Sequence, residues 1–133
     1  MFIFANCQYV IAINLIDMND KLQIYLQEID EETQLLMNEY VSRPLAFTAY
    51  ILDEISELIN IDEYKVVYGS TKDSAGRTRG EIYGYGLSTN HEVLTLFYTL
   101  YDSSSDGTVK NVTEQQYQTA LNRLQGFYNS SIR

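Results

Sequence analysis

Cysteine, histidine, proline and tryptophan are scarce or absent in this chain, and each scarcity excludes something. The one cysteine, Cys7, cannot form a disulfide or a thiolate metal site within a single chain, which suits a reducing cytoplasm. Its aromatic neighbours Phe4 and Tyr9 favour a buried, inert thiol over a nucleophile. One proline and seven glycines leave no composition for a long linker, so the 133 residues predict a single domain.

Basic residues are also few, with 9 Lys and Arg against 18 Asp and Glu, for a formal net charge of -9. Such a surface repels nucleic-acid phosphates, so direct nucleic-acid binding is disfavoured. It is equally unsuited to an anionic membrane surface. The charge is explained either by solubility or by mimicry of nucleic acid that blocks a basic groove on another protein.

The first 17 residues are apolar but contain no lysine or arginine. They do not fit a secretory signal, which begins with positive charge, and polar residues interrupt them too soon for a transmembrane helix. Two interpretations stay open. Residues 1–17 form an extra strand centred on Tyr9–Ile13, or Met18 is the native start and the segment is mis-annotated upstream sequence.

The rest of the chain, 18–133, predicts a helical hairpin, a β-meander and a carboxy-terminal helix. One helix begins at Asn19, and a second is capped at Ser42, has Pro44 in its first turn and ends near Asn60. A strand at Tyr64–Tyr68 precedes a polar loop at 71–80. The last helix begins with a capping box of Thr113 and Gln116, and its apolar stripe contains Tyr117, Leu121, Leu124 and Tyr128.

The segment GEIYGYGLSTNHEVLTLFYTLYD, residues 80–102, predicts a β-hairpin. Its second arm, LTLFYTL, is apolar on both faces apart from two threonines, which is typical of a central strand. In the first arm, Gly84 and Gly86 leave one face without side chains. We expect a helix or a neighbouring tyrosine, rather than a ligand, to fill that space.

Two motifs suggest chemistry only weakly. The segment from Asp102 to Thr113 has some features of a calcium loop, but it lacks the final glutamate and an incoming helix, which favours a turn. The single histidine, His91, lies in the predicted hairpin turn, where a solvated position is favoured over a catalytic triad.

The predicted order of helix, three strands and helix also describes the core of restriction-endonuclease-like nucleases. Those enzymes hold Mg²⁺ with acidic residues from the first helix and two strands, assisted by a lysine. The candidate ligands here are Glu54, Glu57, Glu81 and Glu92. The third strand offers Thr95, Phe97 and Thr99 instead of an acid and a lysine, so the chain predicts the scaffold without the metal site.

Residues 46–102 resemble the amino-terminal region of the abortive infection phage resistance (AIPR) proteins. The resemblance rests on the helix that begins at Ala46, the glycine-tyrosine strand IYGYGLS and the following strand LTLFYTLYD. It implies a bacterial phage-defence protein whose relatives are longer, so this chain resembles a detached or truncated amino-terminal domain. No catalytic residue can be carried over from the family.

The fold prediction is therefore α+β, close to α/β, with a mixed sheet of three or more strands flanked by helices. The order is α-α-β-β-β-α, with a restriction-endonuclease-like core. The favoured function is a non-catalytic, nuclease-like domain of a phage-defence protein that works through protein contacts. The alternatives are an Mg²⁺-dependent nuclease domain and an acidic inhibitor or nucleic-acid mimic from a phage or mobile element.

For the favoured function we expect no cofactor, a cytoplasmic location and an interaction surface of exposed tyrosines. The expected partner is another protein or the remainder of a longer defence protein, and a homo-oligomer is left open. The expected surface comprises Tyr83, Tyr85, Tyr98 and Tyr101. The inhibitor alternative instead predicts one continuous acidic face, formed by Asp30, Glu31, Glu32, Asp53, Glu54 and Glu57.

Overall fold

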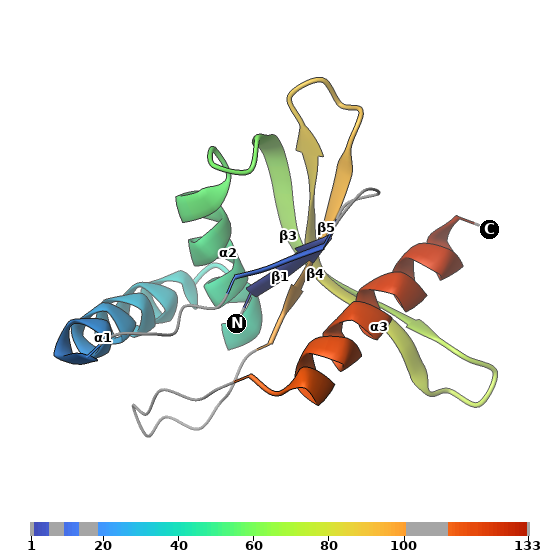
Figure 1. Ribbon diagram of the computed structural model, residues 1–133, viewed down its shortest axis with the longest axis horizontal. Helices are drawn as coiled ribbons and strands as arrows, with labels where there is room; N and C mark the ends of the chain where they lie inside the picture. The colour runs from blue at the N-terminus through green and yellow to red at the C-terminus, as the bar shows by residue number, and fades with distance from the viewer. Residues whose placement is uncertain (1, 6–9, 14–18, 101–111, 133) are drawn as a thin grey trace.

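The computed structural model describes the backbone of residues 2–5, 10–13, 19–100 and 112–132, and the side chains of 24–100 and 112–132. Helices α1 (Asn19–Leu36) and α2 (Arg43–Ile55) lie to one side of the strands in Figure 1, and α3 (Glu114–Ser131) lies to the other. The strands form one five-stranded sheet in the order β2-β1-β5-β4-β3. Their bounds are β1 Phe2–Ala5, β2 Val10–Ile13, β3 Ile61–Lys72, β4 Thr78–Ser88 and β5 Leu94–Thr99. The α+β class and the order of the elements after Met18 are confirmed.

Every strand pairing in this sheet is antiparallel. The expectation of a mixed sheet was therefore wrong. The physical reason is the connectivity: only four or five residues separate β1 from β2, β3 from β4 and β4 from β5, which is too short for the crossover that a parallel pair needs. β1 then pairs with β5, also antiparallel. Two strands therefore come from within residues 1–17, on the side of β5 away from β4.

Local sequence chemistry explains the helix starts. Ser42 caps α2 by accepting a hydrogen bond from the backbone N–H of Leu45 at 3.5 Å, and a proline lies in the first turn. Thr113 and Gln116 form the predicted capping box of α3, with reciprocal bonds of 3.1 and 3.0 Å. The end of α2 was predicted too late: the helix stops at Ile55, and Asn60 adopts a left-handed φ of 55° in the turn before β3.

The prediction of a polar loop over residues 71–80 is wrong. Strand β3 continues to Lys72 and β4 begins at Thr78, so only 73–77 form the turn. Asp73 organises this turn, because its carboxylate accepts hydrogen bonds from the backbone N–H groups of Ala75 and Arg77, both at 2.9 Å. Polar side chains do not prevent strand pairing, since the ladder bonds are made by the backbone.

Strand β5 is the middle strand of the five, as its apolar sequence predicted. Its buried Phe97 packs with Ile51 and Leu52 of α2 and with Ile61 of β3. The neighbouring Leu96 and Tyr98 pack instead against the cluster that includes Ala120 and Leu124 of α3. Because successive side chains of a strand point to opposite faces, the two clusters lie on opposite faces of β5.

The bare face at Gly84 and Gly86 is filled differently from our expectation. A Cβ at Gly84 would lie 2.7 Å from the carbonyl oxygen of Lys65, and one at Gly86 would lie 2.7 Å from a side-chain carbon of Ile61. The adjacent strand β3 and the side chain at its start therefore occupy the space, rather than a helix or a tyrosine. The two glycines allow β3 to approach β4 closely.

Candidate functional site

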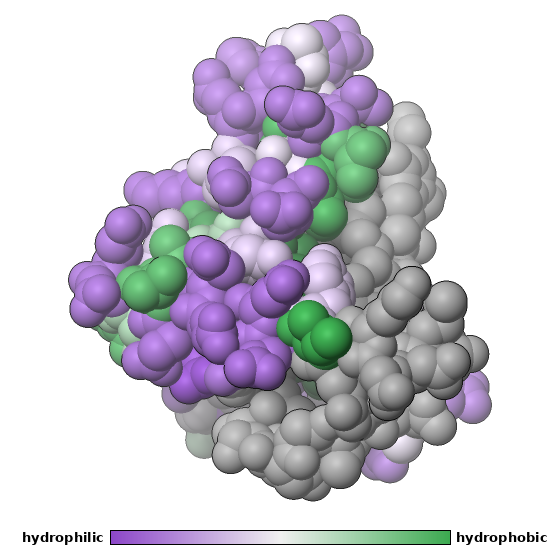
Figure 2. Space-filling model, turned by 90° about the vertical axis from the view of Figure 1, so that its left-hand side faces the viewer, coloured by the Kyte–Doolittle hydropathy of each residue, from purple (hydrophilic) through white to green (hydrophobic). Residues whose placement is uncertain are grey.

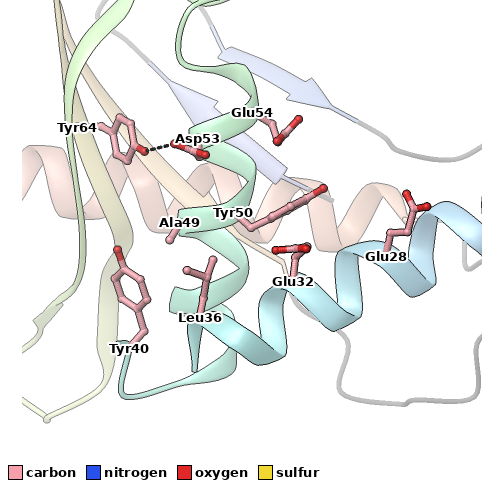
Figure 3. Close-up of a pocket in the computed structure, with 9 residues that line it drawn as sticks. All are labelled: Glu28, Glu32, Leu36, Tyr40, Ala49, Tyr50, Asp53, Glu54 and Tyr64. Atoms are coloured by element: carbon pink, nitrogen blue, oxygen red, sulfur yellow. Dashed lines mark hydrogen bonds between the residues drawn. The ribbon is translucent and has the colours of Figure 1, made fainter. Parts of the chain in front are cut away.

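A cleft lies where α1, α2 and β3 meet, with a volume of about 710 Å³ (Figure 3). Its floor is apolar and comprises the buried Ala49 and the half-buried Leu36. The remaining lining residues are three tyrosines and four acidic residues: Tyr40, Tyr50, Tyr64, Glu28, Glu32, Asp53 and Glu54. A concave site with an apolar floor and convergent polar groups is typical of ligand-binding clefts.

Helical spacing places these residues on one flank of each helix. Glu28, Glu32 and Leu36 follow one another at intervals of four along α1, and Tyr50 and Glu54 do so on α2, so each set shares a face. The buried Ile29 and Thr33 form the next stripe of α1. In Figure 3 the ring of Tyr50 extends between the side chains of Glu32 and Glu54.

The electrostatics of the cleft follow from this crowding of acidic groups. Burial is the main cause that raises the pKa of Tyr50, and the nearby carboxylates of Glu54 and Glu32 raise it further. Burial also raises the pKa of Tyr64, with a further contribution from Asp53, whose Oδ1 accepts a hydrogen bond from the Tyr64 hydroxyl at 3.4 Å. Tyr50 and Tyr64 therefore stay protonated and neutral at physiological pH.

The surface around α1 and α2 is mainly hydrophilic. Figure 2, which faces the side of the molecule where these helices lie, shows hydrophobic residues only as small separated areas. Several apolar side chains of this region are nevertheless exposed, among them Ile24, Leu35 and Leu58. Scattered exposure of this kind is normal for the surface of a folded domain and does not by itself indicate an interface.

Three of the predicted interaction tyrosines lie on the sheet. Tyr83 packs edge-to-face against Tyr68, with 5.6 Å between ring centroids, and against Tyr98, with 5.5 Å. Burial raises the pKa of Tyr83 to about 12 and also raises that of Tyr98. Tyr85 is half-buried, and Tyr101 lies outside the described residues. The rings of Tyr68, Tyr83 and Tyr98 contact one another across three strands. The role of the four predicted tyrosines as an interaction surface stays a prediction.

Glu81, a candidate metal ligand, lies on β4 and has partners within the fold. Its carboxylate lies 3.4 Å from Nε of Arg123 on α3 and accepts a hydrogen bond from the Tyr68 hydroxyl at 2.8 Å. The Arg123 guanidinium also donates to the backbone carbonyl of Thr78. Glu81 thus joins α3 to β3 and β4, a structural role that sequence reasoning missed because Arg123 is far away in the chain.

Breaking this pair should destabilise the fold. Arg123→Met leaves the Glu81 carboxylate, only 19% exposed, without its cation, and we expect the free energy of unfolding to fall by about 1–3 kcal/mol. Urea unfolding of Arg123→Met, Glu81→Gln and the double variant gives the coupling energy, which should be about 1 kcal/mol. Glu57→Gln is the control, because Glu57 is exposed, and it should change the free energy of unfolding by less than about 0.5 kcal/mol. A coupling energy of zero would contradict the assigned role.

The other candidate ligands lie on different elements from Glu81. Glu54 is exposed on α2, and Glu57 is exposed in the turn that follows it. Glu92 lies in the β4–β5 turn, where it accepts a hydrogen bond from the side chain of Asn90 at 2.7 Å. Within residues 24–100 and 112–132, no three acidic, histidine or cysteine side chains are grouped so as to hold a metal ion.

The middle of β5, where a nuclease would need an acid, faces the core under α2. Thr95, Phe97 and Thr99 are all buried. The hydroxyl of Thr99 hydrogen-bonds with that of Thr48, which also donates to the backbone carbonyl of Pro44 at 2.7 Å. Thr99 is therefore hydrogen-bonded within the fold, and Phe97 is packed in the core.

His91 is exposed in the β4–β5 turn, with Nε2 3.8 Å from a carboxylate oxygen of Glu63. Asp30, one of the six acids of the expected acidic face, pairs instead with Arg43. The calcium-loop motif falls on residues 102–113 and so lies almost wholly outside the described residues, as does the Cys7 side chain. In the described part of the chain, no helix has the length and apolar character needed to cross a bilayer.

Comparison with known proteins gives one family. The family model described as "abortive infection phage resistance protein N-terminal domain" matches residues 47–133, well over half of the chain. The match therefore continues past residue 102, where the resemblance noted in the sequence ended, and includes α3. Neither the comparison with curated proteins nor that with solved structures gave a significant match, so the restriction-endonuclease-like core stays a prediction. The chain belongs to the family of the abortive infection phage resistance protein N-terminal domain, and this places it among phage-defence proteins.

Proposed function

We propose that this domain is a non-catalytic, nuclease-like binding module of a phage-defence protein. It acts through contacts with a protein partner or with the remainder of a longer defence protein, and it needs no cofactor. The observation that carries the proposal is the environment of Glu81, the carboxylate best placed to serve a nuclease-like sheet. It is held by Arg123 and Tyr68, so its charge contributes to folding rather than to a metal site.

Two further observations support the proposal. Strand β5, where a nuclease would carry an acid and a lysine, presents Thr95, Phe97 and Thr99 to the core, where neither a metal ion nor a phosphodiester has access. The cleft between α1 and α2 is acidic, and a phosphate backbone would be repelled from it. An acidic cleft with tyrosine walls instead suits contacts with a protein, since tyrosine offers both a large apolar ring and a hydroxyl.

The test is a nuclease assay on the purified chain. Single- and double-stranded DNA and RNA would be incubated with Mg²⁺, with Mn²⁺ and with EDTA, and we expect no metal-dependent cleavage. Glu54→Gln and Glu92→Gln are the informative variants, because both residues are exposed and the variants should fold normally. Cleavage by the unmodified chain that is lost in either variant would overturn the proposal in favour of the nuclease alternative.

A further inference from the structure

The two flanks of α1 differ in how their acidic residues are paired. On one flank, Arg43 of α2 pairs with Asp30 and donates to the Gln34 side chain at 3.0 Å. The other flank carries Glu28 and Glu32 and faces Glu54 across the cleft. Among the side chains that the structure describes, none of these three glutamates has a basic partner. The fold therefore neutralises one flank and leaves the cleft flank negative.

The walls of the cleft add a second preference for cations. Tyr40, Tyr50 and Tyr64 contribute three rings, and Figure 3 shows the hydroxyl of Tyr64 directed at the Asp53 carboxylate. The face of an aromatic ring carries negative charge density and attracts an ammonium or guanidinium group. Rings and carboxylates around one cleft thus favour the same class of ligand.

The spacing of the acids decides between kinds of cation. A divalent ion needs its carboxylate ligands gathered within a few ångströms, and the described side chains contain no such group. The carboxylates are instead distributed over two helices around a volume of about 710 Å³. That arrangement suits an extended organic cation, and the cleft has room for more than one side chain of a bound peptide.

Arginine fits these features better than lysine. Its guanidinium is planar, so it can stack on a tyrosine ring, and its fork of N–H donors can pair with a carboxylate through two hydrogen bonds at once. We propose that the cleft between α1 and α2 binds an arginine-containing basic segment of the protein partner. This inference rests on the proposed function and names the chemistry of the partner.

The experiment measures binding of a short labelled probe to the full 133-residue chain. The probe is the peptide acetyl-Arg-Gly-Arg-Gly-Arg-amide with a fluorophore, followed by fluorescence anisotropy at low and at physiological salt. Its matched control replaces each arginine by citrulline, which has the same shape without the charge. A lysine peptide and spermidine, tested by competition, separate guanidinium recognition from attraction of any cation.

Two double variants with the same change in net charge locate the site. Glu32→Gln with Glu54→Gln removes two carboxylates of the cleft, whereas Glu31→Gln with Glu57→Gln removes two exposed carboxylates outside it. We expect the cleft variant to weaken binding of the arginine peptide at least tenfold and the control to weaken it less than twofold. Tyr50→Leu should weaken binding about threefold or more, because it removes a ring while leaving every charge.

The outcomes discriminate clearly. Tight binding of the arginine peptide, weaker binding of the lysine peptide and loss in the cleft variant would support the inference. Absence of binding, or equal weakening by both double variants, would overturn it, and so would spermidine competing as well as the arginine peptide. None of these failures bears on catalysis, so the proposed function would still be decided by the nuclease assay.

Discussion

Gly126→Ala should lower the free energy of unfolding by about 3 kcal/mol or more, although alanine is the better helix former. At an exposed helical site the same change would stabilise by about 1 kcal/mol. Here the new Cβ would lie 2.2 Å from the carbonyl oxygen of Arg79 and 2.9 Å from its carbonyl carbon. Both atoms are backbone of β4, so they cannot move aside as a flexible side chain would, and α3 must be displaced.

The measurement is urea unfolding followed by circular dichroism, with Gln125→Ala as the matched control. Gln125 is the exposed neighbour of Gly126 on α3, so its replacement tests helix propensity without the close approach. Gly80→Ala approaches the same crossing from β4, with a Cβ 2.1 Å from the backbone nitrogen of Phe127. It should be similarly damaging. A Gly126→Ala protein more stable than the unmodified chain would show that α3 does not pack here.

Phe97→Ala should cost about 3–5 kcal/mol, the usual range for removing a buried phenylalanine ring. Phe97 is fully buried in the middle strand, between Leu52 of α2 and Ile61 of β3. Its loss leaves a cavity that the sheet cannot close, because strand pairing fixes the backbone on both sides. A domain of this size has a total stability of about 5–15 kcal/mol, so the variant is expected to be close to unfolding.

Phe97→Leu provides the graded comparison and keeps the effect measurable if the alanine variant does not fold. It retains most of the volume and should cost about 1.5 kcal/mol or less. Thermal and urea unfolding of the two variants would give the difference. A loss of less than about 1 kcal/mol for Phe97→Ala would contradict the position of this ring at the centre of the core.

The apolar face of α3 was predicted less well than the capping box at its start. The expected stripe of α3 included Tyr128, which is 41% exposed, whereas the buried residues are Ala120 and Leu124. The contact face is shifted because Gly126 permits the closest approach to β4. Periodicity indicates that a helix has an apolar face, but the most closely packed line on that face depends on the partner surface.

The candidate site was also only partly predictable from the sequence. The intervals of four that unite Glu28 with Glu32, and Tyr50 with Glu54, are visible in the sequence. They do not indicate that the two pairs face each other, since that depends on which stripe of α1 packs against α2. Conversely, Glu81 appeared to be an available ligand only because its partner Arg123 is distant in the chain.

The features that depend mainly on neighbouring residues could be predicted before the structure was known. These are the caps at Ser42 and Thr113, the hairpin that ends in β5, the central position of that strand and the membership of the family. Capping bonds and strand alternation span only a few residues, so composition and spacing suffice to predict them. Which carboxylates are paired and which line the cleft could not be predicted in this way. Those outcomes depend on contacts between elements far apart in the chain, where the packing of two helices and a sheet selects one arrangement among many.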